Sequence, residues 1–143
     1  MRVFLLAVMA LFASQAAVAG HHEESLKLDK RQADAMMTVT SINLGDNGTT
    51  ITATGDMGEY GKVYATYNLT RGADGVSGKV TGQGRGVMNN EVVTGDFVGH
   101  WYREGAILTM HNIVQINDGY QNLNVITFDA AKNELLVKTY ILK

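Results

Sequence analysis

Short segments in which apolar and polar residues alternate begin at residue 35 and continue almost to the C-terminus. Alternation with a period of two places successive side chains on opposite faces, which is typical of β-strands. Turn-forming residues separate these segments at regular spacing, a pattern that predicts an all-β sandwich or barrel. The expected strands are 35–44, 49–56, 62–70, 76–87, 91–102, 106–116, 121–128 and 134–142.

The connections between the expected strands are short and rich in glycine, asparagine and aspartate. Asn89-Asn90, Glu104-Gly105 and Asp118-Gly119 are suited to two-residue hairpin turns, which require positive φ. Strands that are neighbours in sequence should therefore pair in space. About eight strands joined up and down in this way can close into a single antiparallel barrel without exposed edges.

Two-residue turns at these three places fix which residues face inward. The predicted inner face is apolar and consists of Val80, Val93, Phe97, Trp101, Leu108, Met110, Val114, Leu123, Val125, Leu135, Val137 and Ile141. The opposite face is polar and consists of Lys79, Gln83, Arg85, Thr94, Asp96, His100, Thr109, His111, Gln115, Asn122, Asn124 and Lys138. Because side chains alternate, a register error of one residue would exchange the two faces of a strand.

Three glycines at alternating positions give one expected strand a bare inner face. The spacing does not match G-x-G-x-x-G and no helix is expected to follow, so the segment is not a phosphate loop. The glycines favour either a sharply coiled strand, with Phe97 lying across bare backbone, or the wall of a ligand cavity. The predicted cavity, for a small apolar molecule, is formed by Gly82, Gly84, Gly86, Phe97, Trp101, Met110, Asn112 and Thr127.

The N-terminal 19 residues have the order of a secretory signal peptide. Arg2 precedes an unbroken apolar run over 3–12, and small residues end in Ala17-Val18-Ala19, an A-x-A cleavage pattern. The sequence therefore predicts a signal peptide at 1–19, a polar N-terminal arm at 20–34 and a barrel domain at 35–143, exported to the periplasm or the extracellular space. No later apolar run is long enough to predict an integral membrane segment.

Charge and residue chemistry limit the partners. The chain has 12 basic and 14 acidic residues, a net charge of −2, which argues against nucleic acid as a partner. Cleavage after Ala19 would leave Gly20-His21-His22 with a free amine, a nitrogen set that suits square-planar Cu(II) or Ni(II). No other cofactor is expected. His100 and His111 with Asp96 offer a second candidate for metal or proton chemistry.

Three features resemble the small antiparallel barrels of the allene oxide cyclase and dirigent type. They are the segment 58–64, the strand with alternating glycines, and the closing strand Leu135 to Tyr140. A calycin barrel, such as a lipocalin, is the second resemblance. The resemblance implies a barrel that binds or cyclises an apolar small molecule, or steers its coupling.

The sequence supports three hypotheses about function. The first is a binding module for a small apolar ligand, and the second is a cyclase-like or isomerase-like enzyme using the same cavity. The third is a structural or assembly role for the outer face. An outer-membrane barrel is disfavoured, because charged residues interrupt the predicted outer face.

Apolar residues on the predicted outer face form an expected patch, which predicts a homo-oligomer. The patch consists of Val98, Ile107, Ile113, Ile126, Phe128, Leu136, Tyr140 and Leu142. Alternatively, the N-terminal arm covers the patch with Leu26, Leu28 and Met36.

Overall fold

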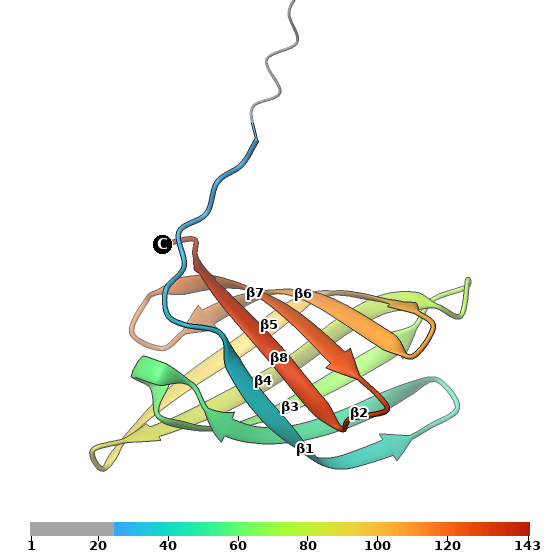
Figure 1. Ribbon diagram of the computed structural model, residues 1–143, viewed down its shortest axis with the longest axis horizontal. Helices are drawn as coiled ribbons and strands as arrows, with labels where there is room; N and C mark the ends of the chain where they lie inside the picture. Colours follow the sequence, from blue (N-terminus) through green and yellow to red (C-terminus); the bar gives the residue numbers. More distant parts are fainter. Residues whose placement is uncertain (1–24) are drawn as a thin grey trace, which may run out of the picture.

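Eight antiparallel strands pair in sequence order and the first pairs with the last, so the sheet closes into a barrel (Figure 1). The computed structural model describes residues 25–143. The strands are β1 (Ala35–Leu44), β2 (Gly48–Asp56), β3 (Lys62–Arg71), β4 (Ser77–Met88), β5 (Glu91–Glu104), β6 (Ile107–Ile116), β7 (Gln121–Asp129) and β8 (Glu134–Ile141). The prediction of an all-β, up-and-down antiparallel barrel of about eight strands is confirmed.

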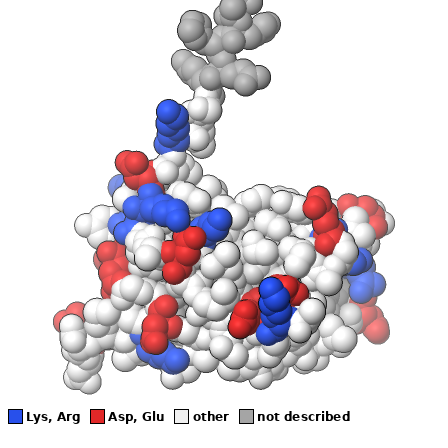
Figure 2. Space-filling view, in the orientation of Figure 1, with Lys and Arg blue, Asp and Glu red and all other residues white. Residues whose placement is uncertain are grey.

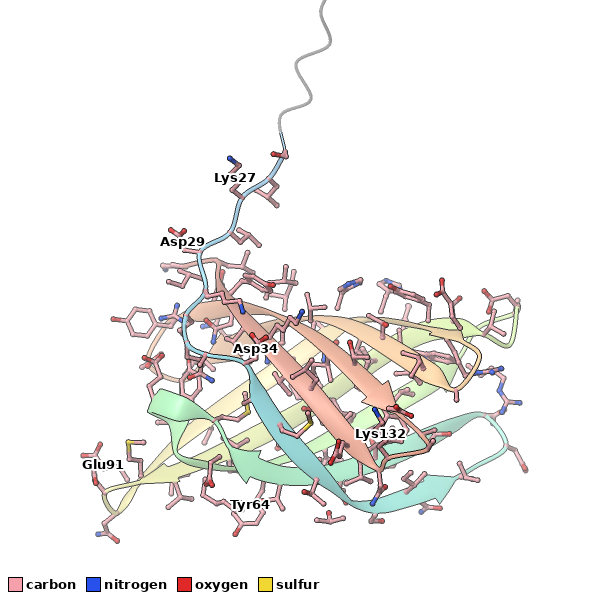
Figure 3. The ribbon with its side chains drawn as sticks, in the orientation of Figure 1. Lys27, Asp29, Asp34, Tyr64, Glu91 and Lys132 are labelled. Atoms are coloured by element: carbon pink, nitrogen blue, oxygen red, sulfur yellow. The ribbon has the colours of Figure 1, made fainter. Side chains whose placement is uncertain are left out.

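The hairpin connections divide between the two ends of the barrel. One end, called the η1 end, carries the short 3-10 helix η1 (Gly58–Tyr60), the β4–β5 turn and the β6–β7 loop. The other, called the Trp101 end, carries the β1–β2, β3–β4, β5–β6 and β7–β8 connections. Glu91 and Lys132 lie at these opposite ends in Figure 3.

The β4–β5 hairpin has the predicted register. Asn89 and Asn90 have φ values of 53° and 66°, as a two-residue hairpin turn requires. Gly84 is therefore opposite Gly95, and Gly82 is opposite Phe97. The prediction for this hairpin is confirmed.

The β5–β6 turn is displaced along the chain. Glu104 pairs with Ile107, so the turn residues are Gly105 and Ala106 and not Glu104-Gly105. The cross-strand partners shift by two residues, so that Trp101 pairs with Met110. A shift of two leaves every side chain on its predicted face, because alternation has a period of two.

The predicted faces of β7 are wrong. Gln115 pairs with Gln121, and the Ile116 N–H donates to the Tyr120 carbonyl at 2.9 Å. The connection therefore contains one residue more than a two-residue turn on Asp118-Gly119. This single extra residue exchanges the faces of β7. Inward positions belong to Asn122, Asn124, Ile126 and Phe128, and outward positions to Leu123, Val125 and Thr127.

The exchange corrects both the expected core and the expected outer patch. Ile126 and Phe128, predicted on the outer face, are 1% and 6% exposed. Leu123 replaces them outside, where cross-strand pairs connect Val98 to Ile113, Ile113 to Leu123 and Leu123 to Tyr140. A layer of fully buried side chains fills the middle of the barrel. This layer contains Met37, Val80, Met110, Ile126, Leu135 and Val137.

Part of the N-terminal segment is attached to the barrel. The Ile141 N–H donates to the Asp29 carbonyl, and the Arg31 N–H donates to the Thr139 carbonyl, both at 2.9 Å. Figure 1 shows this segment passing beside the C-terminus. Leu26 is 84% exposed, so it does not cover the outer wall. No helix within residues 25–143 has the length and apolar character needed to cross a bilayer.

Candidate functional site

The three alternating glycines of β4 lie on the inner face, but they do not have the same surroundings. A Cβ added at Gly82 would lie 2.5 Å from Phe97 Cζ, and one at Gly86 would lie 2.4 Å from the Tyr60 carbonyl oxygen. A Cβ at Gly84 would meet nothing closer than 3.7 Å. Gly82 and Gly86 are therefore covered by neighbours, and Gly84 alone of the three leaves free space.

That space belongs to a cavity of about 70 Å³, called here the glycine cavity. Its apolar wall includes Gly84, Gly86, Gly95, Val63 and Phe97. Its polar side chains come from η1, β3, β7 and β8, and they are Tyr60, Tyr67, Asn122, Asn124 and Thr139. Among residues 25–143, no carboxylate, histidine, lysine, arginine or cysteine side chain lines this cavity.

A row of polar side chains crosses the barrel interior beside this cavity. Asn112 of β6 pairs with Asn124 of β7, which pairs with Thr139 of β8. Asn112 is 0% exposed and Thr139 is 1% exposed. Both amide atoms of Asn112, Oδ1 of Asn124 and Oγ1 of Thr139 are buried and have no hydrogen-bond partner among residues 25–143. Polar atoms in this situation cost free energy unless a ligand or an ordered water satisfies them.

The opposite side of the row is shaped by another glycine. Gly99 of β5 is the cross-strand neighbour of Asn112, and a Cβ at Gly99 would lie 2.7 Å from Asn112 Oδ1. The missing side chain gives the Asn112 amide room to lie inside a tightly packed wall. The polar row therefore depends on glycine, as the cavity does.

A hydrogen-bonded cluster borders the cavity at the η1 end. Asn122 Nδ2 donates to the Tyr60 hydroxyl at 2.9 Å, and Arg31 Nε donates to Asn122 Oδ1. Arg31 also donates to the Lys143 carbonyl at 2.9 Å and lies 4.8 Å from the centre of the Tyr120 ring. The Arg31 side chain thus connects the N-terminal segment to the β6–β7 loop and to the C-terminus.

The two cavity tyrosines are held in their neutral form. Burial raises the pKa of the Tyr60 hydroxyl, and the hydrogen bond from Asn122 and the Arg31 charge oppose this rise. Burial alone raises the pKa of Tyr67 far above the usual tyrosine range. The Tyr67 ring also packs against Phe97, with 5.1 Å between ring centres. These tyrosines can donate or accept hydrogen bonds but do not supply a charge at neutral pH.

The structure divides the predicted cavity residues. Gly84, Gly86 and Phe97 line the glycine cavity, and Gly82 lies beneath Phe97. Asn112 belongs to the adjoining polar row. The remaining three are elsewhere: Trp101 at the other end of the barrel, Met110 in the buried middle layer, and Thr127 on the outer wall.

Five polar residues of this site, Tyr67 of β3 among them, are not predicted from the sequence. Asn122 and Asn124 depend on the faces of β7, which the extra loop residue exchanges, whereas Thr139 lies on the predicted inner face of β8, between Val137 and Ile141. The position of Tyr60 could have been predicted from the sequence, because Gly58 and Gly61 flank it in a tight turn. Their φ values are positive, 51° and 65°. Such a turn fixes the tyrosine at the barrel end.

The histidines of the outer wall pair across two strands. His100 lies directly opposite His111, and Asp96 lies opposite Gln115. Within residues 25–143, no three metal-ligating side chains of His, Cys, Asp or Glu come together. The predicted Cu(II) or Ni(II) site at Gly20, His21 and His22 lies outside the described residues, as does the predicted signal peptide.

Comparisons with known proteins returned no match to a family model, a curated protein or a solved structure.

Proposed function

We propose that this protein is a small-ligand-binding barrel, and that its ligand enters the glycine cavity. The observation that carries the proposal is the row of buried polar atoms without partners beside a cavity opened by Gly84. A hydrogen-bonding group on a ligand would satisfy Asn124 Oδ1 and Thr139 Oγ1, while its apolar part would contact Phe97 and Val63.

The cavity's size limits what enters. A cavity of about 150 Å³ holds benzene, and the glycine cavity is about 70 Å³. The inserted part of the ligand is therefore a few non-hydrogen atoms, such as the end of a longer molecule. Because the lining offers only neutral polar groups, it favours an uncharged ligand and binding over acid–base catalysis.

Titration with 1-butanol, followed in ¹⁵N–¹H NMR spectra, tests the proposal. Saturable shifts of the Asn122 and Asn124 side-chain amides are expected. Gly84→Val should remove them by filling the cavity, whereas Gln83→Val places the same side chain on the outer wall and should leave them. Thr139→Val should weaken binding by removing one hydrogen bond. Saturable amide shifts that survive Gly84→Val would contradict the proposal.

Export is the second part of the proposal, and it rests on the signal-like order of residues 1–19. N-terminal sequencing of the protein from its own source should begin at Gly20. A full-length cytoplasmic product would contradict export. If processing occurs as proposed, Cu(II) should give a square-planar visible spectrum that His22→Ala abolishes.

We also propose that the barrel self-associates through its outer wall. Val98 and Ile113 are 59% and 53% exposed and directly paired, and Leu123 and Tyr140 extend the apolar row. Contiguous exposed apolar surface commonly marks an interface. Sedimentation should show a closed oligomer that Ile113→Lys dissociates, and a wild-type monomer at micromolar concentration would contradict this.

A further inference from the structure

The Trp101 end of the barrel holds a second and larger cavity, of about 380 Å³. The buried middle layer, with Met37, Met110 and Leu135 each 0% exposed, lies between this cavity and the glycine cavity. We call this larger cavity the Trp101 mouth. Its apolar wall includes Ile51, Leu69, Trp101, Leu108 and Phe128. A volume of this size falls within the range of small-molecule sites.

Trp101 is fixed in the wall of this mouth by a glycine on the neighbouring strand. Gly78 pairs with Trp101, and a Cβ at Gly78 would lie 2.9 Å from Trp101 Nε1. The indole therefore reaches across β4, where Nε1 donates to the Thr70 carbonyl at 3.0 Å. With its one polar atom satisfied, the ring contributes an apolar surface to the mouth.

Two arginines stand at the rim of the same mouth. Arg71 continues the inward series of β3 after Tyr67 and Leu69, and Arg103 continues that of β5 after Trp101. Both line the cavity, and both are exposed. The inward series of these strands thus changes from apolar side chains to positive charge where the barrel opens.

Within the described part of the chain, no carboxylate neutralises these two arginines. The lining of the mouth contains no acidic side chain, and neither arginine belongs to an ion pair within residues 25–143. Asp74, in the adjacent β3–β4 turn, is used locally: its carboxylate accepts hydrogen bonds from Val76 N at 3.0 Å and from Ser77 N at 2.9 Å. The rim therefore presents two guanidinium groups above an apolar wall.

We propose that the Trp101 mouth binds a small amphiphile with a carboxylate head and a hydrocarbon tail. Arginine matches the planar, two-oxygen geometry of a carboxylate, so Arg71 and Arg103 hold the head at the rim. The tail lies against Trp101 and Phe128 and is stopped by the middle layer. This site is separate from the glycine cavity and takes a charged ligand, whereas that cavity takes an uncharged one.

The chain contains a single tryptophan, so fluorescence reports directly on the mouth. Titration with sodium octanoate should shift the Trp101 emission and saturate. At equal concentration, 1-octanol, which lacks the charged head, should bind about tenfold more weakly, and acetate, which lacks the tail, should cause no shift. About tenfold corresponds to the loss of one charge-assisted hydrogen bond.

Protein variants locate the site. Arg71→Gln and Arg103→Gln should each weaken octanoate binding about tenfold, whereas Arg85→Gln, which removes the same charge from the outer wall, should not. Gly84→Val should leave octanoate binding intact, since it fills only the other cavity. Equal affinity for 1-octanol, insensitivity to both rim variants, loss of binding in Gly84→Val, or a response to anionic phosphatidylglycerol vesicles but not to free octanoate would each overturn the proposal.

Discussion

The Phe97 ring lies across the bare backbone of Gly82, so that a Cβ at Gly82 would be 2.5 Å from Phe97 Cζ and 2.0 Å from the Thr66 carbonyl oxygen. Two residues further along the same strand, Gly84 has open space. The two glycines therefore have different surroundings on the same face of β4. One glycine admits an aromatic ring, and the next opens a cavity.

The first prediction compares alanine at these two positions. Gly82→Ala should lower the free energy of unfolding by about 1–3 kcal/mol, because ring and backbone must move apart. Gly84→Ala should raise it by about 0.5–1 kcal/mol, because glycine within a strand is less stable than alanine. Urea denaturation measures both. Equal effects would mean that the two positions do not differ in packing.

The second prediction concerns the unpaired hydroxyl of Thr139. Thr139→Val has nearly the same shape and removes a buried oxygen without a partner, so it should raise the free energy of unfolding of the ligand-free protein by about 1–2 kcal/mol. The control is Thr127→Val on the outer wall, which should change it by less than about 0.5 kcal/mol. Destabilisation by Thr139→Val would show that a tightly held water satisfies this hydroxyl.

The third prediction concerns Arg31, which joins three separate segments at the η1 end. Arg31→Ala leaves Asn122 Oδ1 buried without this donor, and it should lower the free energy of unfolding by about 1–3 kcal/mol. Amide hydrogen exchange should also accelerate at Ile141, whose N–H donates to Asp29. Lys30→Ala removes only an exposed ion pair with Asp34 and should have little effect. Unchanged exchange in Arg31→Ala would contradict a fastening role.

Much of the fold can be predicted from the sequence, because turn residues and the alternation of apolar and polar residues determine it. Positive φ at Asn89 and Asn90 fixes the β4–β5 register, and strict alternation carries that register along both strands. The sequence predicts the β5–β6 turn at Glu104-Gly105 and the structure has it two positions of register away, yet Trp101 and Met110 keep their predicted faces because a shift of two preserves the alternation.

The candidate site is harder to predict from the sequence, because the inward face of β7 depends on one residue of the β6–β7 loop. Asp118-Gly119 matches a two-residue turn, but the Ile116 N–H donates to the Tyr120 carbonyl and Asp118 Oδ1 accepts a hydrogen bond from the Tyr120 N–H, both at 2.9 Å, so the loop also includes Asn117. That choice depends on local hydrogen bonding in the folded loop. It turns Asn122 and Asn124 inward, against their polarity, which a pattern based on burial of apolar residues cannot anticipate.

The last prediction is a loss of stability at alkaline pH that depends on Tyr67. Burial raises the pKa of this hydroxyl in the folded protein, while an unfolded chain has a tyrosine pKa of about 10. Below pH 10 the hydroxyl is neutral in both states and its contribution to stability is fully present. Above pH 10 the unfolded chain loses the proton first, so the free energy of unfolding falls as pH rises toward the folded-state pKa.

Tyr67→Phe should make this fall shallower in urea denaturation between pH 9 and 11. Tyr64→Phe is the matched control, because its ring points away from the barrel (Figure 3) and is 57% exposed. The predicted order is a clear change for Tyr67→Phe and none for Tyr64→Phe, and equal slopes in both variants would mean that the Tyr67 hydroxyl is not shielded from water.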